Sequence, residues 1–292
     1  NGMYFDELYH GRTAYEHLSN LTPYENTHPP LGKLIIMTGI AVFGMNPFGW
    51  RFMGTLFGAL MVPVMYLLAR RLLKNRRYAA FAAVLFTFDF MHFAQSRLAT
   101  IDVFAVFFIM LMYYFMLKYW QMDFYADGLR ATQKPLWWCG LCFGLGAATK
   151  WICLYAGAGL AVLFFITLWR RYRQYRAFKD SEQREVVACF PVYAIKTLGV
   201  CVIAFIIIPV CVYVASYTPY FIHYRPENIF AEVWNWQKYM FGYHSQLTER
   251  HYFESKWYTW LLDIRPIWYY NGSMLPQGTH ESISSFGNPA VW

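Results

Sequence analysis

The chain has 292 residues, of which 58% are hydrophobic and 21% aromatic, while only 14% are charged. This composition excludes an ordinary soluble domain and is typical of a polytopic membrane protein. The net charge of +8 does not indicate a nucleic-acid partner, because the basic residues cluster at the ends of apolar segments, where they report membrane topology.

Six apolar runs are candidates for transmembrane helices, since a helix needs about 20 apolar residues to cross the bilayer. In chain order they are roughly residues 50–73, 78–93, 101–120, 136–149, 152–169 and 195–217, of which the second and fourth are short. A further run, 34–43, is too short to cross and predicts an interfacial or re-entrant helix. The predicted fold class is an all-α polytopic membrane protein with about six transmembrane helices and interfacial helices in its outer loops.

The basic clusters in residues 70–77 and 170–184 set the orientation. Both follow apolar runs, so the positive-inside rule places them in the cytoplasm and the N-terminus outside. The predicted organisation is a first outer loop with an interfacial helix (1–49), a transmembrane domain (50–217) and a second outer loop (218–292). The chain begins on Asn1 and stops within a loop, which indicates a C-terminally truncated fragment of a longer protein.

This topology gathers isolated charges from three segments at the outer face of the membrane. Asp6 and Glu7 lie in the first outer loop, whereas Arg97 and Lys150 lie at the outer ends of apolar runs. Ionisable groups at a membrane boundary are costly and usually functional, which predicts one site of carboxylates and cations. Some of these charges also have a structural interpretation. Arg97 and Lys150 can anchor helix ends by extending their side chains to the interface. Asp102, at the same face, can stabilise the first turn of its helix.

Several stretches together resemble the protein O-mannosyltransferase family, which are membrane glycosyltransferases of the GT-C type. They are YFDELYHGRTAYE, THPPLGKL, FGWRFMGTLFGALMVPVMYLLA, AQSRLATIDVF, GLGAATKW and SKWYTWLLDIRPIWYY, in the family's order and over essentially the whole chain. The resemblance implies transfer of mannose from a polyprenyl-phosphate carrier to a Ser or Thr hydroxyl of a protein, with inversion at the sugar carbon. The last outer loop is too short for the soluble domain of eukaryotic members, which points to the bacterial branch.

The resemblance also implies roles for particular residues. Asp6 is the expected general base, and Glu7 is expected to help position the acceptor. Arg97 and Lys150 are expected to hold the phosphate of the carrier. The chemistry is reasonable without the family, because a hydroxyl is a poor nucleophile that a positioned carboxylate can deprotonate, and fixed cations stabilise a leaving phosphate.

His28 of the H-P-P motif and Arg265 of the last motif complete the expected substrate-binding residues. We expect no cofactor and no metal, because the lipid-linked sugar is itself a substrate. The expected partners are the polyprenyl-phosphate sugar lipid, secreted or membrane acceptor proteins that contain Ser or Thr, and the lipid bilayer, with no nucleic acid. The expected location is the cell membrane, with the active site on its extracytoplasmic face.

Two alternatives stay open at this point. A related GT-C enzyme could use a lipid carrier to move another sugar, for example aminoarabinose onto a lipid. A membrane transporter is a less favoured alternative, because its ionisable residues would lie near the midplane of the bilayer and its halves would repeat. The sequence instead keeps the middle of each run apolar and contains no internal repeat.

Overall fold

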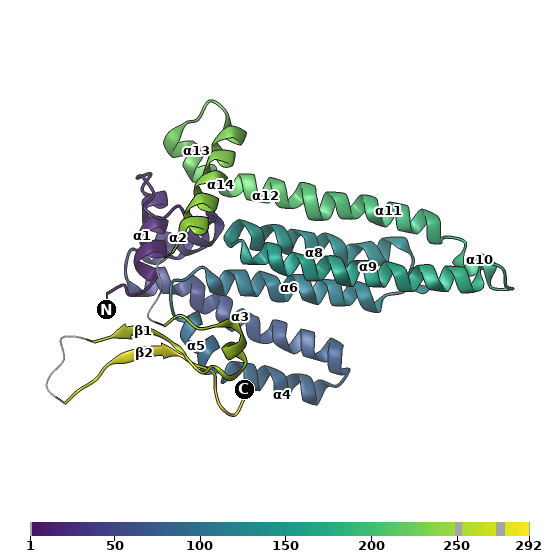
Figure 1. Ribbon diagram of the computed structural model, residues 1–292, viewed down its shortest axis with the longest axis horizontal. Coiled ribbons are helices and arrows are strands. Elements are labelled where there is room, and N and C mark those ends of the chain that lie inside the picture. Colours follow the sequence, from purple (N-terminus) through teal and green to yellow (C-terminus); the bar gives the residue numbers. More distant parts are fainter. Residues whose placement is uncertain (1, 249–252, 273–277, 292) are drawn as a thin grey trace. The chain divides into compact units, whose positions relative to one another are not determined.

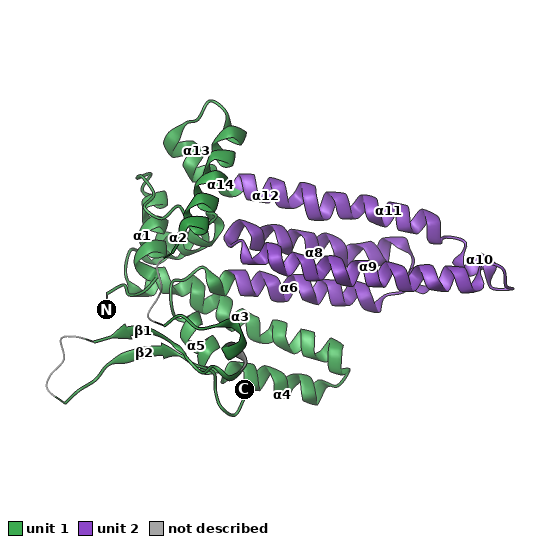
Figure 2. Ribbon diagram, viewed as in Figure 1, with its two compact units in different colours: residues 1–104, 216–292 green, residues 105–215 purple. Residues whose placement is uncertain are grey.

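Nearly all the regular structure is helical in the computed structural model, which describes residues 2–248, 253–272 and 278–291 (Figure 1). The chain forms two units (Figure 2), of which unit 1 contains residues 1–104 and 216–292 and unit 2 contains residues 105–215. The first boundary lies in the first turn of α6 (Asp102–Gln121), and the second lies at the last residue of α12 (Ile208–Ser216).

Unit 1 combines the two segments that the sequence places in outer loops with the helices that connect them. Its elements are α1 (Glu7–Leu18), α2 (Leu31–Phe43), α3 (Pro47–Leu73), α4 (Arg76–Thr87), α5 (Phe90–Ser96), α13 (Thr218–Tyr224), α14 (Ile229–Gln246), the 3₁₀ helix η2 (Trp257–Leu262), β1 (Ile267–Asn271) and β2 (Ser282–Ser285). The strands pair antiparallel, with an irregularity between Trp268 and Tyr270. This strand pair is a departure from the all-α expectation, and β1 begins within the last of the motifs that carry the family resemblance.

The sequence at the start of α3 explains where that long helix begins. The side-chain oxygen of Asn46 accepts hydrogen bonds from the backbone N–H groups of Phe48 (3.1 Å) and Gly49 (3.0 Å), and Pro47 occupies the first turn. Asparagine at this position satisfies donors that the first helical turn leaves unpaired, and proline is tolerated there because its missing N–H is not needed.

Two glycines one turn apart on α3, Gly54 and Gly58, allow the segment that follows α5 to lie directly on the helix. A Cβ atom on Gly54 would come within 2.8 Å of the carbonyl oxygen of Leu98, and one on Gly58 would collide with the side chain of Ser96. The Thr55 hydroxyl between them donates to the carbonyl of Ser96 at 3.3 Å. The G-x-x-x-G spacing on α3 therefore positions the Q-S-R segment, residues 95–97, in unit 1.

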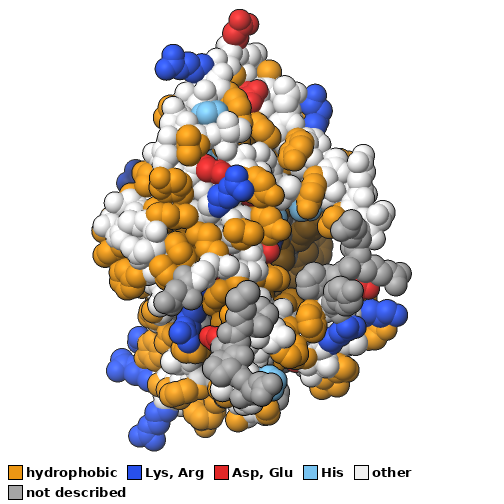
Figure 3. All heavy atoms as spheres, turned by 90° about the vertical axis from the view of Figure 1, so that its left-hand side faces the viewer, with side chains coloured by type: hydrophobic (Ala, Val, Ile, Leu, Met, Phe, Trp, Pro, Cys, Tyr) orange, Lys and Arg blue, Asp and Glu red, His pale blue; other side chains and the backbone are white. Residues whose placement is uncertain are grey.

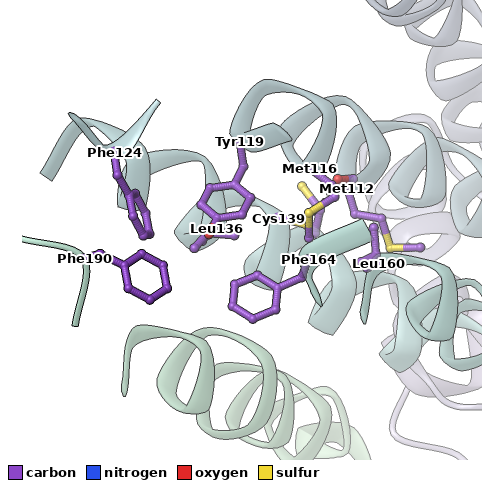
Figure 4. Packing of buried hydrophobic residues seen from close by; sticks show 10 residues of the cluster. Met112, Met116, Tyr119, Phe124, Leu136, Cys139, Leu160, Phe164 and Phe190 are labelled. Carbon is purple, nitrogen blue, oxygen red and sulfur yellow. Dashed lines mark hydrogen bonds between the residues drawn. The ribbon is translucent and has the colours of Figure 1, made fainter. Parts of the chain in front are cut away.

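Unit 2 is a set of apolar helices around a hydrophobic core. Its elements are the rest of α6, α7 (Phe124–Asp127), α8 (Leu129–Thr149), α9 (Ile152–Phe178), α10 (Arg184–Val187), α11 (Phe190–Val202), the π-helix η1 (Ile203–Ile207) and α12. Figure 4 shows the core side chains, which include Met112, Tyr119, Leu136, Phe164 and Phe190. Cys139 lies among them, and its thiol donates to the carbonyl oxygen of Met112 at 3.1 Å, so this cysteine packs as a small apolar side chain of the core.

The π-helix is explained by the proline that follows it. Pro209 has no backbone N–H, so the carbonyl of residue 205 loses its usual partner, and a wide turn is a common way to accommodate such a break. Gly140 and Gly144 of α8 face this stretch closely: a Cβ on Gly144 would lie 2.8 Å from the Cα of Pro209, and one on Gly140 would collide with the backbone of Ala204. The two helices are therefore in backbone contact.

Arg171, one of the basic residues that the sequence analysis assigned to an inner cluster, is buried in unit 2. Its Nη2 donates to the carbonyl oxygens of Tyr119 (3.2 Å) and Met122 (2.9 Å) at the end of α6, and its guanidinium lies 3.8 Å from the ring centre of Phe124. A cation near the C-terminus of a helix binds carbonyls that have no helical partner. This arginine therefore fastens α9 to α6.

Four helical segments among the described residues are long and apolar enough to cross a membrane: 47–73, 102–121, 152–178 and 184–216. They match the first, third, fifth and sixth predicted runs. The other two runs are also helical, but the second is divided into α4, of 12 residues, and α5, while the fourth lies within α8, of 21 residues. The short run predicted at 34–43 falls within α2, of 13 residues. The predicted three-part division relative to the membrane stays a prediction.

Candidate active site

The acidic pair lies at the start of α1 in unit 1. The carbonyl oxygen of Asp6 accepts hydrogen bonds from the N–H groups of Tyr9 (3.1 Å) and His10 (3.0 Å), so this residue opens the helix, and its side chain is partly exposed. The preceding residue, Phe5, has φ of 53°, a left-handed conformation that costs a non-glycine residue about 1–3 kcal/mol. Its ring packs edge-on against Tyr269 at 4.5 Å between ring centres, and this contact holds the turn that presents Asp6.

Glu7, in contrast, has no exposed side-chain surface. Its two oxygens accept hydrogen bonds from Nε and Nη2 of Arg51, both at 2.7 Å, and one of them also accepts the backbone N–H of Ala99 at 3.0 Å. A bidentate contact between arginine and carboxylate is among the strongest and most directional of protein hydrogen bonds. Glu7 therefore joins α1, α3 and the segment after Q-S-R at one point.

Arg51 also contacts the segment that precedes the acidic pair. Its guanidinium lies 5.0 Å from the ring centre of Tyr4, and its Nη2 donates to the carbonyl of Gly2 at 3.2 Å. Burial raises the pKa of the Tyr4 hydroxyl, and the nearby positive charges of Arg51 and Arg97 oppose that rise. Tyr4 is therefore a neutral phenol with the Arg51 guanidinium over its ring.

Arg97 is exposed at the end of α5, with its guanidinium 4.9 Å from the ring centre of Phe93. The positive charge of Arg97 opposes the rise that burial causes in the pKa of Tyr4. Two residues after Arg97, the N–H of Ala99 donates a hydrogen bond to Glu7. The structure therefore brings this predicted residue into the neighbourhood of the acidic motif. The face shown in Figure 3 carries mainly hydrophobic and uncharged side chains, with acidic and basic ones dispersed among them.

The hairpin in residues 267–285 supplies a wall that the sequence analysis did not foresee. Tyr269 packs on Phe5, and Tyr270 packs on Tyr4 at 5.2 Å between ring centres. The amide of Gln95 donates a hydrogen bond to the hydroxyl of Tyr269. Burial, together with the negative charges of nearby Asp102 and Asp6, raises the pKa of Tyr269 to about 12. Tyr269 is therefore a buried, protonated phenol next to the acidic motif.

A buried ion pair supports the H-P-P loop. Lys33 of α2 has 0% exposed side-chain surface, and its ammonium donates to Oε2 of Glu25 (2.6 Å) and to the carbonyls of Glu25 (2.9 Å) and His28 (3.0 Å). All three of its donors are used, as burial of an ammonium requires. Burial alone would raise the pKa of Glu25, but the Lys33 ammonium and the hydrogen bonds of His10 and His28 outweigh burial and lower that pKa. The pKa of Lys33 is lowered by burial, and the nearby charge of Glu25 opposes this change.

His28, a predicted substrate-binding residue, belongs to this buried network. Its Nδ1 lies 3.2 Å from Oε1 of Glu25, and its ring lies between those of His10 (5.8 Å) and His244 (5.4 Å). Nε2 of His244 in turn lies 2.8 Å from the carbonyl oxygen of Thr27. The histidine therefore connects α1, the H-P-P loop and α14.

The remaining two predicted residues lie apart in the chain. Lys150 follows α8 in unit 2, where its N–H donates to the carbonyl of Gly146 at 2.9 Å, so its participation in a site with the acidic pair stays a prediction. Arg265 lies in unit 1 between η2 and β1, exposed, and lines a cavity together with Gln95 and Tyr269.

Four residues of this region were missed as functional by the sequence analysis: Arg51, Glu25, Lys33 and Tyr269. Three of them are single charges beside or within apolar helical segments, and such isolated charges were the signal that could have identified them. Tyr269 carries no such signal, since it is one of 24 tyrosines in the chain.

Comparisons with known proteins match this chain to one family. The family model described as dolichyl-phosphate-mannose-protein mannosyltransferase matches residues 41–225. A Mycobacterium tuberculosis protein named polyprenol-phosphate-mannose--protein mannosyltransferase is 28% identical to this chain, over 99% of this chain and 63% of the relative. A Corynebacterium glutamicum protein of the same name is 29% identical, over 91% of this chain and 58% of the relative. The chain thus spans about three fifths of the length of these curated relatives.

Solved structures share the fold. The Saccharomyces cerevisiae protein O-mannosyltransferase Pmt1-Pmt2 complex bound to the sugar donor aligns over 76% of this chain and 30% of the matched chain, with a TM-score of 0.60 and 20% identity. ArnT from Cupriavidus metallidurans in the apo state aligns over 89% of this chain and 43% of the ArnT chain, with a TM-score of 0.51 and 17% identity. The predicted GT-C type fold of a multi-pass membrane protein is confirmed, and the chain belongs to the dolichyl-phosphate-mannose-protein mannosyltransferase family.

Proposed function

We propose that this protein transfers a mannosyl group from polyprenyl-phosphate-mannose to Ser or Thr hydroxyls of acceptor proteins. The observation that carries the proposal is the acidic pair, in which a partly exposed Asp6 stands beside a Glu7 held by Arg51 and Ala99. The names of the mycobacterial and corynebacterial relatives support the same activity. The site faces the extracytoplasmic side of the cell membrane in this proposal.

In the proposed reaction the acceptor hydroxyl oxygen attacks the anomeric carbon of the donor while the bond from that carbon to the phosphate oxygen breaks. Asp6 takes the hydroxyl proton, and polyprenyl phosphate leaves with the bonding electrons. A positioned base of this kind contributes roughly 10²–10⁴ to the rate. Attack from the side opposite the leaving group inverts the anomeric centre, and the displacement needs neither a metal ion nor a cofactor.

Glu7 has a different role from Asp6 in this mechanism. Because its side chain is fully buried and both oxygens bind Arg51, it helps to position the acceptor indirectly, by fixing the turn on which Asp6 stands. The same carboxylate binds the N–H of Ala99, two residues after Arg97. Glu7 therefore sets the spacing between the base and one of the cations.

The cations receive the negative charge that develops on the leaving phosphate. We assign this task to Arg97, Lys150 and Arg265, since fixed cations in a partly dehydrated site stabilise such charge more than water does. His28 acts from the buried Glu25 network as part of the substrate-binding loop. The role of Lys150 is tested by its own variant, Lys150→Ala.

The decisive experiment measures transfer of radiolabelled mannose from polyprenyl-phosphate-mannose to a Ser/Thr peptide by the full chain in membranes. We expect Asp6→Asn to abolish transfer while the protein still accumulates, and Asp180→Asn to leave it unchanged, since that side chain is 84% exposed in unit 2. Arg97→Ala and Lys150→Ala should weaken use of the donor, whereas Arg184→Ala, at an exposed position, should not.

The outcomes separate this proposal from the alternatives. Full transfer by Asp6→Asn would refute the assignment of the base. Label that appears in lipid rather than in peptide, or transfer of another sugar such as aminoarabinose in preference to mannose, would support a related enzyme with a different substrate. Normal use of the donor by Lys150→Ala would remove that residue from the phosphate site.

A further inference from the structure

An apolar groove of about 450 Å³ lies in unit 2, lined by α9 and by the helix that α11 and η1 form together. Its floor includes Met116, Leu160 and Phe164, which are labelled in Figure 4 and are at most 6% exposed. Its rim includes Phe165 and Ile206, which are 60% and 57% exposed. The groove is therefore open at the surface of the apolar helices, where a membrane protein meets hydrocarbon.

Aromatic contacts limit the groove at both ends. Near the start of α9, the ring of Phe143 lies on Gly157, where a Cβ atom would come within 2.5 Å of it. The same ring lies 6.3 Å from that of Phe205 in η1, between ring centres. At the other end, Phe190 of α11 stacks on Tyr175 of α9 at 5.3 Å. The groove occupies the stretch between these contacts and includes the wide turn of the π-helix, a feature that often marks a functional site.

A cation lies about one leaflet away from the far end of the groove. Arg173 follows Gly157 by 16 residues, which at the rise of an α-helix is about 24 Å along the axis. One leaflet with its headgroups is about 20–22 Å thick. Side chains lean toward the start of their helix, so the guanidinium lies closer to the groove than its Cα does. A lipid with its phosphate at Arg173 would therefore place the end of one chain in the groove.

One side of α9 continues from the groove to the basic end of the helix. Side chains spaced by four, four and three residues share one side of a helix, and this side carries Phe165, Trp169, Arg173 and Arg176, all of them exposed. Nη1 of Arg176 donates to the hydroxyl of Tyr172 at 3.3 Å, so this side chain reaches back toward the groove. Tryptophan is typical of the headgroup level. The order along this side is therefore groove, headgroup level and cations.

The chemistry of these two regions indicates a phospholipid. Every lining residue of the groove that the structure describes is hydrophobic, apart from Gly157, so the groove suits a hydrocarbon chain. Arginine binds phosphate through paired N–H groups. Two arginines favour an anionic headgroup over a zwitterionic one, because they repel the cation of the latter. Basic residues beside transmembrane helices bind anionic lipid headgroups in this way.

We propose that the groove binds one acyl chain of an anionic phospholipid whose phosphate contacts Arg173 and Arg176. The positive-inside rule puts these arginines on the cytoplasmic side, so the lipid belongs to that leaflet. It differs from the sugar carrier, because Lys150, which we assign to the carrier's phosphate, precedes the opposite end of α9. The bound chain fills the space between α9 and η1 and stabilises unit 2. The proposal goes beyond the proposed function and does not depend on it.

The test measures the thermal unfolding midpoint of the purified full chain in detergent during titration with phosphatidylglycerol. A ligand that binds only the folded protein raises this midpoint as its concentration increases. We expect a saturable rise with phosphatidylglycerol, whereas phosphatidylcholine should need at least about tenfold more lipid for the same rise.

Two variants test the headgroup contact. In Arg173→Gln/Arg176→Gln the half-saturating concentration of phosphatidylglycerol should increase at least about tenfold, because hydrogen bonds between charged groups are lost. Lys196→Gln is the matched control, since it removes a positive charge from an exposed position of α11. Lys196 precedes Leu198 of the groove by two residues, which turn a helix by about 200°, so it lies on the opposite face and its loss should have no effect.

A second pair of variants tests the groove itself. Ala161 lines the groove and is exposed, so Ala161→Phe should fill the space and abolish the response to phosphatidylglycerol. Val162→Phe adds a similar ring at the next position, which is 58% exposed and turned about 100° along the helix, and it should keep the response. Without lipid, both variants should unfold at the midpoint of the original protein, because both positions are exposed.

Several outcomes would overturn the proposal. An equal response to phosphatidylcholine, or an unchanged half-saturating concentration in Arg173→Gln/Arg176→Gln, would exclude the anionic headgroup contact. A response that Ala161→Phe keeps, or that both phenylalanine variants lose, would exclude the groove. Displacement of phosphatidylglycerol by polyprenyl phosphate would assign the groove to the sugar carrier instead. No mannose transfer is measured, so failure of the proposed function would leave this result unaffected.

Discussion

The contact between Glu7 and Arg51 offers the sharpest test of how the acidic motif is built. In Glu7→Gln the side chain keeps its shape, but it loses its charge and presents an NH₂ group to a guanidinium. Removal of one partner from a buried ion pair typically costs about 3–5 kcal/mol. Arg51 is 23% exposed and also lies over the Tyr4 ring, so part of its charge stays solvated, and we expect a loss of about 2–4 kcal/mol in the free energy of unfolding.

The measurement is thermal unfolding of the purified full chain in lipid nanodiscs, as a double-mutant cycle with Arg51→Met. If the two side chains act as one unit, the double variant should be clearly more stable than the sum of the single effects predicts. Transfer activity should fall in Glu7→Gln together with the unfolding midpoint, whereas Asp6→Asn should lose transfer with an unchanged midpoint. Additive effects in the cycle, or a Glu7→Gln variant as stable as the original, would refute the structural role of Glu7.

The remaining predictions concern the packing and the buried charge that support the motif. Gly54→Ala should destabilise the protein by about 1–3 kcal/mol and reduce transfer, because its Cβ would approach the Leu98 carbonyl to 2.8 Å. Gly199→Ala in α11 is the control: its Cβ meets no atom within 4 Å, and alanine favours a helix more than glycine does, so this variant should not be destabilised in the same unfolding assay. Lys33→Met should cost about 3–5 kcal/mol by leaving the Glu25 carboxylate buried and unpaired, again measured by thermal unfolding. The pKa of Glu25 is lower in the folded state than its ordinary value of 4.5. The carboxylate therefore stabilises the folded protein above that pH, and this contribution is lost as the pH falls below it. The thermal unfolding midpoint should drop between about pH 5 and about pH 3, and it should drop less in Glu25→Gln. A midpoint independent of pH in that range would contradict the buried ion pair.

Membrane-spanning helices were predictable because their signal is local. A run of about 20 apolar residues is visible without knowledge of any partner, and four of the six predicted runs correspond to helices with the length and composition to cross a membrane. The break within the second run was less visible, because Asp89 both interrupts the apolar run and caps the next helix, with its side chain accepting the N–H of His92 at 2.9 Å. A single polar residue in an apolar run predicts either an anchor or a break, and the sequence alone does not distinguish them.

The candidate site was predictable only in part. Asp6, Glu7 and Arg97 were singled out from their motifs, and their roles stay predictions; two residues after Arg97, the N–H of Ala99 binds Glu7. The different environments of the two acids were not predictable. Glu7 is buried because Arg51, 44 positions later, reaches its carboxylate, and no local pattern reports a contact of that separation.

The sequence by itself determined the membrane class, the helical segments and the motif residues, because these depend on local composition, spacing and residue type. Only the tertiary structure decided which acid is buried, which lysine is paired, and that the strand pair β1 and β2 places Tyr269 against Phe5. Such contacts join residues far apart in the chain, and their energies depend on burial and partner geometry, which exist only once the chain has folded.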